Sequence, residues 1–359
     1  MKILVIQDHL RSGGTERQSL LLAGAAAPAG HAATLLTFRP GGALGTQAGA
    51  GRRSLQPVDL GLDWFAPGLF RAVRRSMPDA VVCMGRMANC YAGFLQAGFP
   101  DIPVVATLRT GKTLPWLYRR SLRIARHVVA NSRDARDRAV ASLGVPAERI
   151  TVIPNALVFP PDPLAPRDPG LRAHLGAGPG TFVMLCVAMF RPEKNQAELV
   201  EIAAGLPAAL DWQLWLAGDG PERARCERLA RKRGAAERVR FLGYRADPSP
   251  LYSAADAAVL ASRAESLSNF LIEAQARGLP AVAFAAQGVA ECFLDGETGW
   301  TVSPGDRDSF RSAIARLAAE SAGRRAERAA KAAAFARGAF DPARQAAAYF
   351  ELLLRLKGS

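Results

Sequence analysis

Residues 181–189 read TFVMLCVAM, a continuous apolar run that ends at the polar segment FRPEKN (190–195). A strand with one face in water alternates apolar and polar residues, whereas this run shows no such alternation. It therefore predicts a strand that is buried on both faces, as in a parallel sheet flanked by helices. The helix-patterned segment that follows completes the strand–helix unit from which such sheets are built.

Ten further apolar runs alternate with helix-patterned segments along the chain. Those of the first half are residues 2–7, 33–38, 80–84, 103–108, 127–131 and 150–154. Those of the second half, besides 181–189, are residues 212–218, 239–243, 257–262 and 280–285. Repeated strand–helix alternation predicts a doubly wound parallel sheet, and the pattern occurs twice.

A proline-rich stretch, PNALVFPPDPLAPRDPG (154–170), separates the two series. Proline fixes φ and lacks an N–H donor, so this stretch favours a linker over a helix or strand. We expect an α/β protein with two Rossmann-like domains and a cleft between them. The predicted division is a domain at 1–160, a linker at 161–178, a second domain at 179–340, and a helix at 341–359 that packs back on the first domain. The Gly-rich segment 40–53 predicts a surface loop.

The charge of the chain is unevenly distributed. Of 359 residues, the first 160 hold 20 Lys/Arg against 9 Asp/Glu, and the rest hold 26 against 23. A basic first half favours an anionic partner, although solvated surface charge explains part of the excess. The five cysteines are widely spaced and predict no disulfide framework or zinc cluster. No run is long enough for a signal peptide or a membrane span, so we expect a cytoplasmic protein, free or held at the inner face of the membrane.

Two glutamates bracket a short predicted helix in SRAESLSNFLIEAQARGLP (262–280). Either Ser266 or Ser268 can cap this helix, whose unpaired first-turn N–H groups attract anions. Glu265 lies in the loop before it, and Glu273 can point back toward its start. A phosphate flanked by two hydroxyl-rich groups, as in a nucleotide sugar, matches this arrangement. The alternative is structural: Glu265 favours the helix dipole and Glu273 pairs with Arg277.

Two other motifs follow predicted strands of the second half. Arg191 and Lys194 come after the run at 181–189, where an open α/β sheet binds its ligands. Their charges can neutralise a diphosphate, or they mark a solvated helix start. In LAGDGPE (216–222), Gly218 and Gly220 either let the backbone approach a ligand or form the turn.

The second half resembles the retaining glycosyltransferases of family 4, which have the GT-B fold of two facing Rossmann-like domains. The resemblance covers about 120 residues in order and spacing. Its stretches are VAMFRPEKN (187–195), LAGDGPE (216–222), FLGYRADPSPLYSAADAAVLAS (241–262), ESLSNFLIEAQARGLPAV (265–282) and GVAECFLDGETGW (288–300). The first half is similar more loosely, through SGGTERQ (12–18), NSRDARD (131–137) and GVPAERITVIPN (144–155).

The resemblance implies transfer of a sugar from a nucleotide-diphosphate donor to a hydroxyl acceptor, with retention and without a metal or other cofactor. Glu265 then contacts the donor sugar and Glu273 the ribose, while Lys194 and Arg191 hold the diphosphate. The other implied donor-side residues are Leu267, Ser268, Asn269, Gly13, Gly14, Gly218, Tyr244 and Arg245. The implied setting is envelope polysaccharide or lipopolysaccharide assembly, with a saccharide or lipid-linked saccharide as acceptor.

Two positions depart from the family pattern. Met189 stands where the family has an arginine, and Arg109 stands where it has a histidine near the reacting sugar. For the acceptor side we predict Arg109, Arg86, Asn89 and His9. The basic segment LPWLYRRSLRIARH (114–127) is either a membrane-surface helix or a packed helix with a solvated face.

Other functions remain as alternatives to the transferase. A sugar-nucleotide epimerase has the same two-domain scaffold. A nucleic-acid-binding protein would suit the basic charge, but no binding motif is present and aromatic content is 7%. A dinucleotide-dependent oxidoreductase is less well supported, because SGGTER lacks the complete glycine fingerprint. We expect no nucleic-acid partner.

Overall fold

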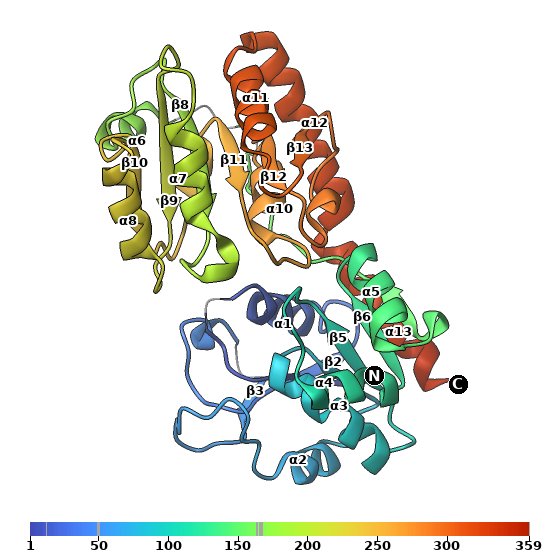
Figure 1. Cartoon of the computed structure of the whole chain (residues 1–359). Helices are drawn as coiled ribbons and strands as arrows, with labels where there is room; N and C mark the ends of the chain where they lie inside the picture. Colours follow the sequence, from blue (N-terminus) through green and yellow to red (C-terminus); the bar gives the residue numbers. More distant parts are fainter. Residues whose placement is uncertain (12, 49–50, 163, 165–167, 359) are drawn as a thin grey trace. The chain divides into compact units, whose positions relative to one another are not determined.

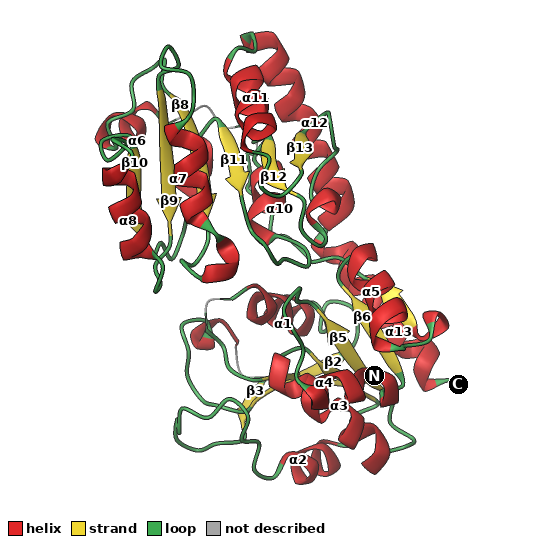
Figure 2. Ribbon diagram, viewed as in Figure 1, coloured by secondary structure: helices red, strands yellow, loops and turns green. Residues whose placement is uncertain are grey.

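The computed structural model describes residues 1–11, 13–48, 51–162, 164 and 168–358. They form two compact units (Figure 1). Unit 1 comprises Met1–Ala156 and Phe340–Ser359, and unit 2 comprises Leu157–Ala339. Each unit has one sheet of parallel strands flanked by helices (Figure 2).

The sheet of unit 1 has seven strands in the order β3-β2-β1-β4-β5-β6-β7. The strands are β1 (Lys2–Gln7), β2 (Ala32–Thr37), β3 (Arg52–Ser54), β4 (Ala80–Cys83), β5 (Val104–Leu108), β6 (His127–Ala130) and β7 (Ile150–Val152). The helices are α1 (Gly14–Gly24), α2 (Leu69–Ser76), α3 (Arg86–Gly98), α4 (Trp116–Ile124), α5 (Arg133–Leu143) and α13 (Pro342–Lys357), with 3-10 turns η1 (Gly45–Ala48) and η2 (Ala147–Arg149).

Both faces of this sheet are covered, which explains its continuous apolar runs. Successive side chains of a strand point to opposite faces. In β1, Leu4 and Ile6 join a core with residues of α2 to α5, while Ile3 and Val5 join a second core with residues of α1 and α13. The last helix of the chain therefore covers the sheet of unit 1.

The sheet of unit 2 has six strands in the order β10-β9-β8-β11-β12-β13. The strands are β8 (Phe182–Val187), β9 (Trp212–Ala217), β10 (Val239–Gly243), β11 (Ala257–Leu260), β12 (Ala281–Phe284) and β13 (Gly299–Val302). The helices are α6 (Pro169–His174), α7 (Gln196–Ala204), α8 (Arg223–Lys232), α9 (Ser249–Ala254), α10 (Asn269–Gln275), α11 (Arg307–Ala318) and α12 (Ala322–Phe340), with 3-10 turns η3 (Pro192–Lys194) and η4 (Val289–Glu291).

The predicted architecture of two doubly wound parallel sheets is confirmed. Each of the eleven predicted strands is present, with ends that differ by at most two residues. Strands β3 and β13 were not predicted. Strand β3 begins in the last two residues of the Gly-rich segment that was expected to be a loop, and residues 49–50 of that segment lie outside the described part.

The range predicted as a linker contains helix α6, and residues 163 and 165–167 of that range lie outside the described part. Arg172 of α6 is buried and forms an ion pair of 3.0 Å with Asp256, which precedes β11. It also donates a hydrogen bond of 2.8 Å to the carbonyl oxygen of Ala254. These contacts attach α6 firmly to unit 2.

Candidate functional site

The candidate site of unit 2 lies at the point where the strand order of its sheet reverses. From β8 the chain proceeds outward to β9 and β10, then returns to the other side of β8 to form β11, β12 and β13. The loops after β8 and β11 therefore leave neighbouring strands in opposite directions. Ligands of open α/β sheets bind at such a switch point, outside the carboxyl ends of the strands.

The loop after β8 is held in place by its neighbours. The N–H of Phe190 donates to the carbonyl oxygen of Asp219, after β9, at 2.9 Å. Asn195, with a positive φ of 52°, donates its side-chain amide to the carbonyl oxygen of Ala261, after β11, at 3.3 Å. This conformation is more accessible to asparagine than to most residues. The side chain between these anchors, Lys194, is thus fixed at the switch point.

Lys194 and Glu265 form an ion pair across the switch point, with 2.6 Å between Nζ and Oε1. The lysine side chain is 26% exposed and the glutamate side chain 8%. Because an ammonium group has three N–H donors, the contact with Glu265 leaves donors for an anion in the adjacent solvent. The two residues are 71 positions apart in sequence.

Of the two possible N-caps of helix α10, Ser266 and Ser268, the structure has Ser268. Its side chain accepts a hydrogen bond from the N–H of Leu271. Its apolar face, which includes Phe270 and Leu271, is buried. The carboxylate of Glu273 accepts a hydrogen bond of 2.7 Å from the hydroxyl of Tyr252 in α9. Arg277 donates instead to the main-chain oxygen of Glu273 and to the hydroxyl of Ser249.

Glycine is required at two positions after β9 because the backbone there lies very close to the backbone of the loop after β8. Gly218 and Gly220 have φ of 142° and 150°. A Cβ atom on Gly218 would lie 2.1 Å from the carbonyl oxygen of Ala188, and one on Gly220 would lie 2.4 Å from that of Phe190. The loops after β8 and β9 therefore pack backbone against backbone, which any larger residue would prevent.

The other predicted donor-side residues of unit 2 lie around these loops. Arg191 is exposed, and its side chain has no hydrogen bond or ion pair among the described residues. Met189 is exposed in the same loop. Tyr244 and Arg245 are exposed after β10, Leu267 and Ser268 are buried, and Asn269 is half-buried.

A cavity of about 290 Å³ in unit 2 lies away from these loops. Its lining includes Phe182, Asp256 and Pro280, which start or precede β8, β11 and β12. The cavity is thus at the amino-terminal edge of the sheet, opposite the Lys194–Glu265 pair. It is not the site that the sequence predicts.

The switch point of unit 1 lies between β1 and β4. Asp8, directly after β1, accepts hydrogen bonds from the N–H groups of Met87 and Ala88 in the first turn of α3, at 2.9 and 2.7 Å. Burial raises the pKa of Asp8 to about 7 although these two N–H donors lower it. Gly13 is the N-cap of α1 and Gly14 its first residue.

The predicted acceptor-side residues of unit 1 have very different surroundings. Asn89 is fully buried, donates its side-chain amide to the carbonyl oxygen of Gly85, and accepts a hydrogen bond from the N–H of Thr107. Arg86 is exposed and donates to the carbonyl oxygen of Thr113 at 3.0 Å.

Arg109 joins the end of β5 to two distant segments. It donates to the side-chain oxygen of Asn155 and, at 2.9 Å, to the hydroxyl of Tyr349 in α13. His9 is mostly buried and its Nε2 lies 3.1 Å from the carbonyl oxygen of Pro40. Burial, aided by the charge of Arg39, lowers the pKa of His9.

Sequence reasoning missed three residues that organise these sites: Asp8, Tyr252 and Tyr349. Tyr252 lies within a stretch already matched to the family, but its bond to Glu273 depends on how α9 and α10 pack. Asp8 could have been suspected as a lone acid directly after an apolar strand. Within the described residues, no three His, Cys, Asp or Glu side chains are grouped closely enough to hold a metal ion.

Two family models match successive parts of the chain. The model described as Glycosyltransferase Family 4 matches residues 12–157, and the model described as Glycosyl transferases group 1 matches residues 169–335. The chain therefore belongs to the family 4 glycosyltransferases, and its fold class is GT-B.

Individual relatives agree with this classification. The lipopolysaccharide core biosynthesis glycosyltransferases LpsE and LpsD of Rhizobium meliloti are 36% and 33% identical to the chain over 149 and 152 residues. Each alignment covers 42% of this chain and 43% of the relative, so the chain spans less than half the length of these curated relatives. A crystal structure of Anabaena HepE in complex with UDP is 25% identical, with a TM-score of 0.82, over 99% of this chain and 100% of that one.

Among the described helices, none combines the length and the apolar composition that crossing a bilayer demands.

Proposed function

We propose that the protein transfers a sugar from a nucleotide-diphosphate sugar to a hydroxyl acceptor, with retention of anomeric configuration. The observation that carries the proposal is the Lys194–Glu265 pair at the switch point of unit 2. A partly exposed ammonium suits a diphosphate, and a carboxylate beside it suits sugar hydroxyls. The enzyme uses no metal or other cofactor.

On the donor side, Lys194 and the exposed Arg191 neutralise the diphosphate, and Glu265 accepts hydrogen bonds from the donor sugar. Glu273 accepts hydrogen bonds from the ribose, and Tyr252 orients its carboxylate. The remaining proposed contacts are the main-chain amides of Leu267, Ser268 and Asn269, the glycines Gly13, Gly14 and Gly218, and the base-side residues Tyr244 and Arg245.

The reaction breaks the bond between the anomeric carbon and the diphosphate oxygen and forms a bond from that carbon to the acceptor oxygen. The hydroxyl proton of the acceptor passes to the departing diphosphate. Negative charge grows on the leaving group as its bond to the sugar lengthens, so the cations of Lys194 and Arg191 stabilise the transition state more than the ground state.

The setting we propose is bacterial envelope polysaccharide or lipopolysaccharide assembly, at the cytoplasmic side. The names of LpsE and LpsD, which are lipopolysaccharide core glycosyltransferases, support this setting. The complex of HepE with UDP supports a nucleotide donor. The acceptor is a free or lipid-linked saccharide, and Arg86, Arg109 and His9 are its proposed contacts in unit 1.

The test is a thermal-shift panel of UDP-, GDP- and ADP-sugars on the wild type, Lys194→Ala and Glu273→Ala. We expect one nucleotide class to raise the Tm of the wild type, and both variants to lose most of that shift. Lys331→Ala is the matched control, because Lys331 forms a surface ion pair with Glu297 in the same unit. Equal shifts in all four proteins would contradict the assignment of the donor site.

Two further measurements separate the alternatives. Incubation with the nucleotide sugar alone leaves the donor unconverted if the protein is a transferase, whereas an epimerase interconverts it. NMR of the product from a competent acceptor gives the anomeric configuration. An inverted product would refute retention but would leave the donor site intact.

A further inference from the structure

A group of large apolar side chains is exposed on unit 1, in the segment that joins β3 to α2. Val58, Leu60 and Trp64 are 62%, 51% and 58% exposed, and Leu62 and Phe65 are each more than one-third exposed. We call residues 58–65 the apolar loop. Single exposed apolar residues are ordinary, but five within eight positions form a patch that calls for an explanation.

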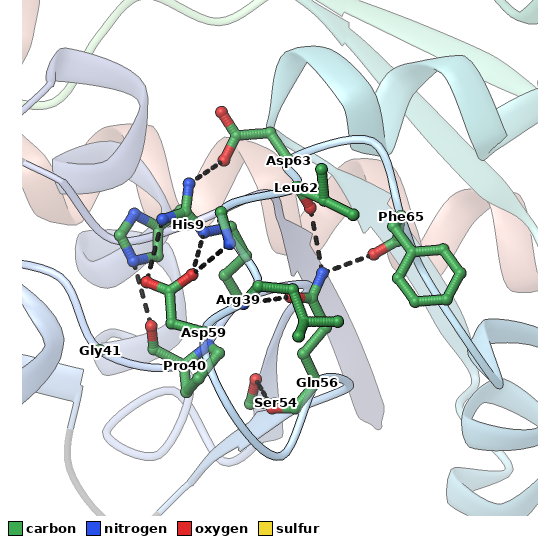
Figure 3. Close-up of polar contacts among 12 residues, drawn as sticks. His9, Arg39, Pro40, Gly41, Ser54, Gln56, Asp59, Leu62, Asp63 and Phe65 are labelled. Carbon is green, nitrogen blue, oxygen red and sulfur yellow. Dashed lines mark hydrogen bonds and ion pairs between the residues drawn. The ribbon is translucent and has the colours of Figure 1, made fainter.

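The exposure does not come from a loose segment, because a buried side chain organises the loop. Gln56 is fully buried, and its side-chain amide donates to the carbonyl oxygens of Leu62 and Phe65 at 3.0 and 2.8 Å (Figure 3). The hydroxyl of Tyr91 in α3 donates to the carbonyl oxygen of Trp64 at 2.8 Å. The side chains of Gln56 and Tyr91 therefore hold the backbone of the apolar loop by hydrogen bonds, while its apolar side chains remain exposed.

The acidic residues of the apolar loop are matched by arginines. Arg39 lies between Asp59 and Asp63, with an N–O distance of 2.7 Å to each (Figure 3). Arg11 forms a second ion pair with Asp63, of 2.6 Å. These contacts neutralise the only two carboxylates of the loop, so they do not oppose an anionic partner.

Helix α2, which directly follows, adds positive charge. Arg71, Arg74 and Arg75 are exposed, and within the described residues none of them forms an ion pair. Phe70 and Met77 are exposed beside them. Three exposed arginines without an ion pair among the described residues thus lie on the helix that follows the apolar loop.

We propose that the apolar loop and α2 form a surface that docks on an anionic lipid bilayer. Leu60 and Trp64 enter the interfacial region, and the arginines of α2 contact lipid phosphates. Burial of apolar side chains and attraction of basic ones to anionic lipids act together in such binding. The proposal concerns where the protein is held, and it stands whether or not the donor site is correctly assigned.

A second copy of the chain fits this surface less well. A symmetric contact would bring the arginines of both copies to one interface, where like charges repel. A nucleic acid could match the arginines but would leave the aliphatic side chains of Val58, Leu60 and Leu62 without an apolar partner.

Helix α4 offers an internal comparison, since the sequence also suggests it as a membrane-surface helix. Its Tyr118 and Leu122 are buried, and Ser121 bonds α3, whereas Trp116 and Leu117 are exposed. The guanidinium of Arg120 lies 5.6 Å from the centre of the Trp116 ring. Each segment exposes a tryptophan and at least one leucine, so a Trp→Ser/Leu→Ser double substitution can be made in both and compared directly.

The test is co-sedimentation with vesicles of phosphatidylcholine alone and of phosphatidylcholine with phosphatidylglycerol. We expect the wild type to bind only the anionic vesicles, and less strongly as salt is raised. The Leu60→Ser/Trp64→Ser variant should bind about tenfold or more weakly, and Arg71→Gln/Arg74→Gln/Arg75→Gln should also lose most binding. The matched variant Trp116→Ser/Leu117→Ser should bind within about twofold of the wild type.

A second measurement locates Trp64 itself. Lipids brominated on the acyl chain should quench the fluorescence of the wild type more than that of Trp64→Phe. Far-UV circular dichroism verifies that each variant is folded. The proposal is overturned if Leu60→Ser/Trp64→Ser binds like the wild type, if only the α4 variant loses binding, or if quenching is equal. It is also overturned if the wild type ignores vesicles and instead self-associates through this surface in sedimentation velocity.

Discussion

Replacing Arg172 by methionine should destabilise unit 2 strongly. The side chains of Arg172 and Asp256 are 5% and 2% exposed, so the pair is well removed from water. In the variant, Asp256 keeps the hydrogen bond from the N–H of Val183, at 2.8 Å, but loses its ion pair with Arg172. The carbonyl oxygens of Ala254, Gly178 and Thr181 lose a donor as well.

The size of the expected loss of stability follows from the burial of this ion pair. Removing one partner of a buried ion pair costs about 3–5 kcal/mol, because the other charge stays buried without the attraction of that partner. For a unit of this size each kcal/mol lowers Tm by about 2–4 °C, so we expect the transition of unit 2 to fall by on the order of 10 °C. Differential scanning calorimetry measures that transition directly, and hydrogen exchange of the α6 amides should accelerate.

The matched control is Arg233→Met. Arg233 also pairs with a carboxylate of unit 2, that of Glu201 at 2.9 Å, but its side chain is 49% exposed. Such a pair contributes about 1 kcal/mol or less. If Arg172→Met is no more destabilising than Arg233→Met, the view that α6 is an integral part of unit 2 is refuted.

Three further predictions concern single groups. Tyr252→Phe removes the hydrogen bond to Glu273 and should weaken nucleotide-sugar binding about tenfold in calorimetry, with Tm nearly unchanged; an unaltered Kd would contradict the positioning role. Burial lowers the pKa of His127 to about 4, so the unfolded state binds its proton more tightly and stability should fall as pH drops from about 6.5 to 4. His127→Gln should reduce that loss in urea titrations, and an equal loss in both proteins would disprove it. Burial raises the pKa of Asp8, which gives the opposite sign: stability should fall as pH rises from about 4 to 7. The carboxyl ¹³C shift of Asp8 should titrate near pH 7, and a midpoint below about 5 would exclude this assignment.

The sequence predicted those parts of the fold that carry a strong local pattern. Strand β8 is apolar throughout and β1 has four consecutive apolar residues, and the sequence placed the ends of both within two residues. Strand β3 consists of Arg52, Arg53 and Ser54 at the edge of a sheet. Because none of these residues is buried, the strand has no apolar pattern that the sequence could reveal. Helix α6 was hidden by neighbouring prolines, although Asp168 caps it and Pro169 occupies a first-turn position that tolerates proline.

The sequence allowed individual residues of the candidate site to be predicted, but not the contacts between them. Lys194, Glu265 and Glu273 were chosen from motifs, and they remain predictions as functional residues. The sequence offered Arg277 as the partner of Glu273, since neighbours four apart on a helix are easy to foresee. The hydroxyl of Tyr252 comes from another helix, and its approach depends on the packing of α9 and α10.

The return of α13 to unit 1 has a consequence for biosynthesis. One face of the first sheet is covered by Tyr349, Phe350, Leu353 and other residues of that helix. The ribosome makes them only after all of unit 2 has been synthesised. Until then α1 covers this face without α13, and the part that α13 buries stays exposed, a condition in which nascent chains attract chaperones or aggregate. The first half of the gene therefore encodes a domain that matures last, and ribosomes stalled before residue 340 should carry it in an immature, protease-sensitive form.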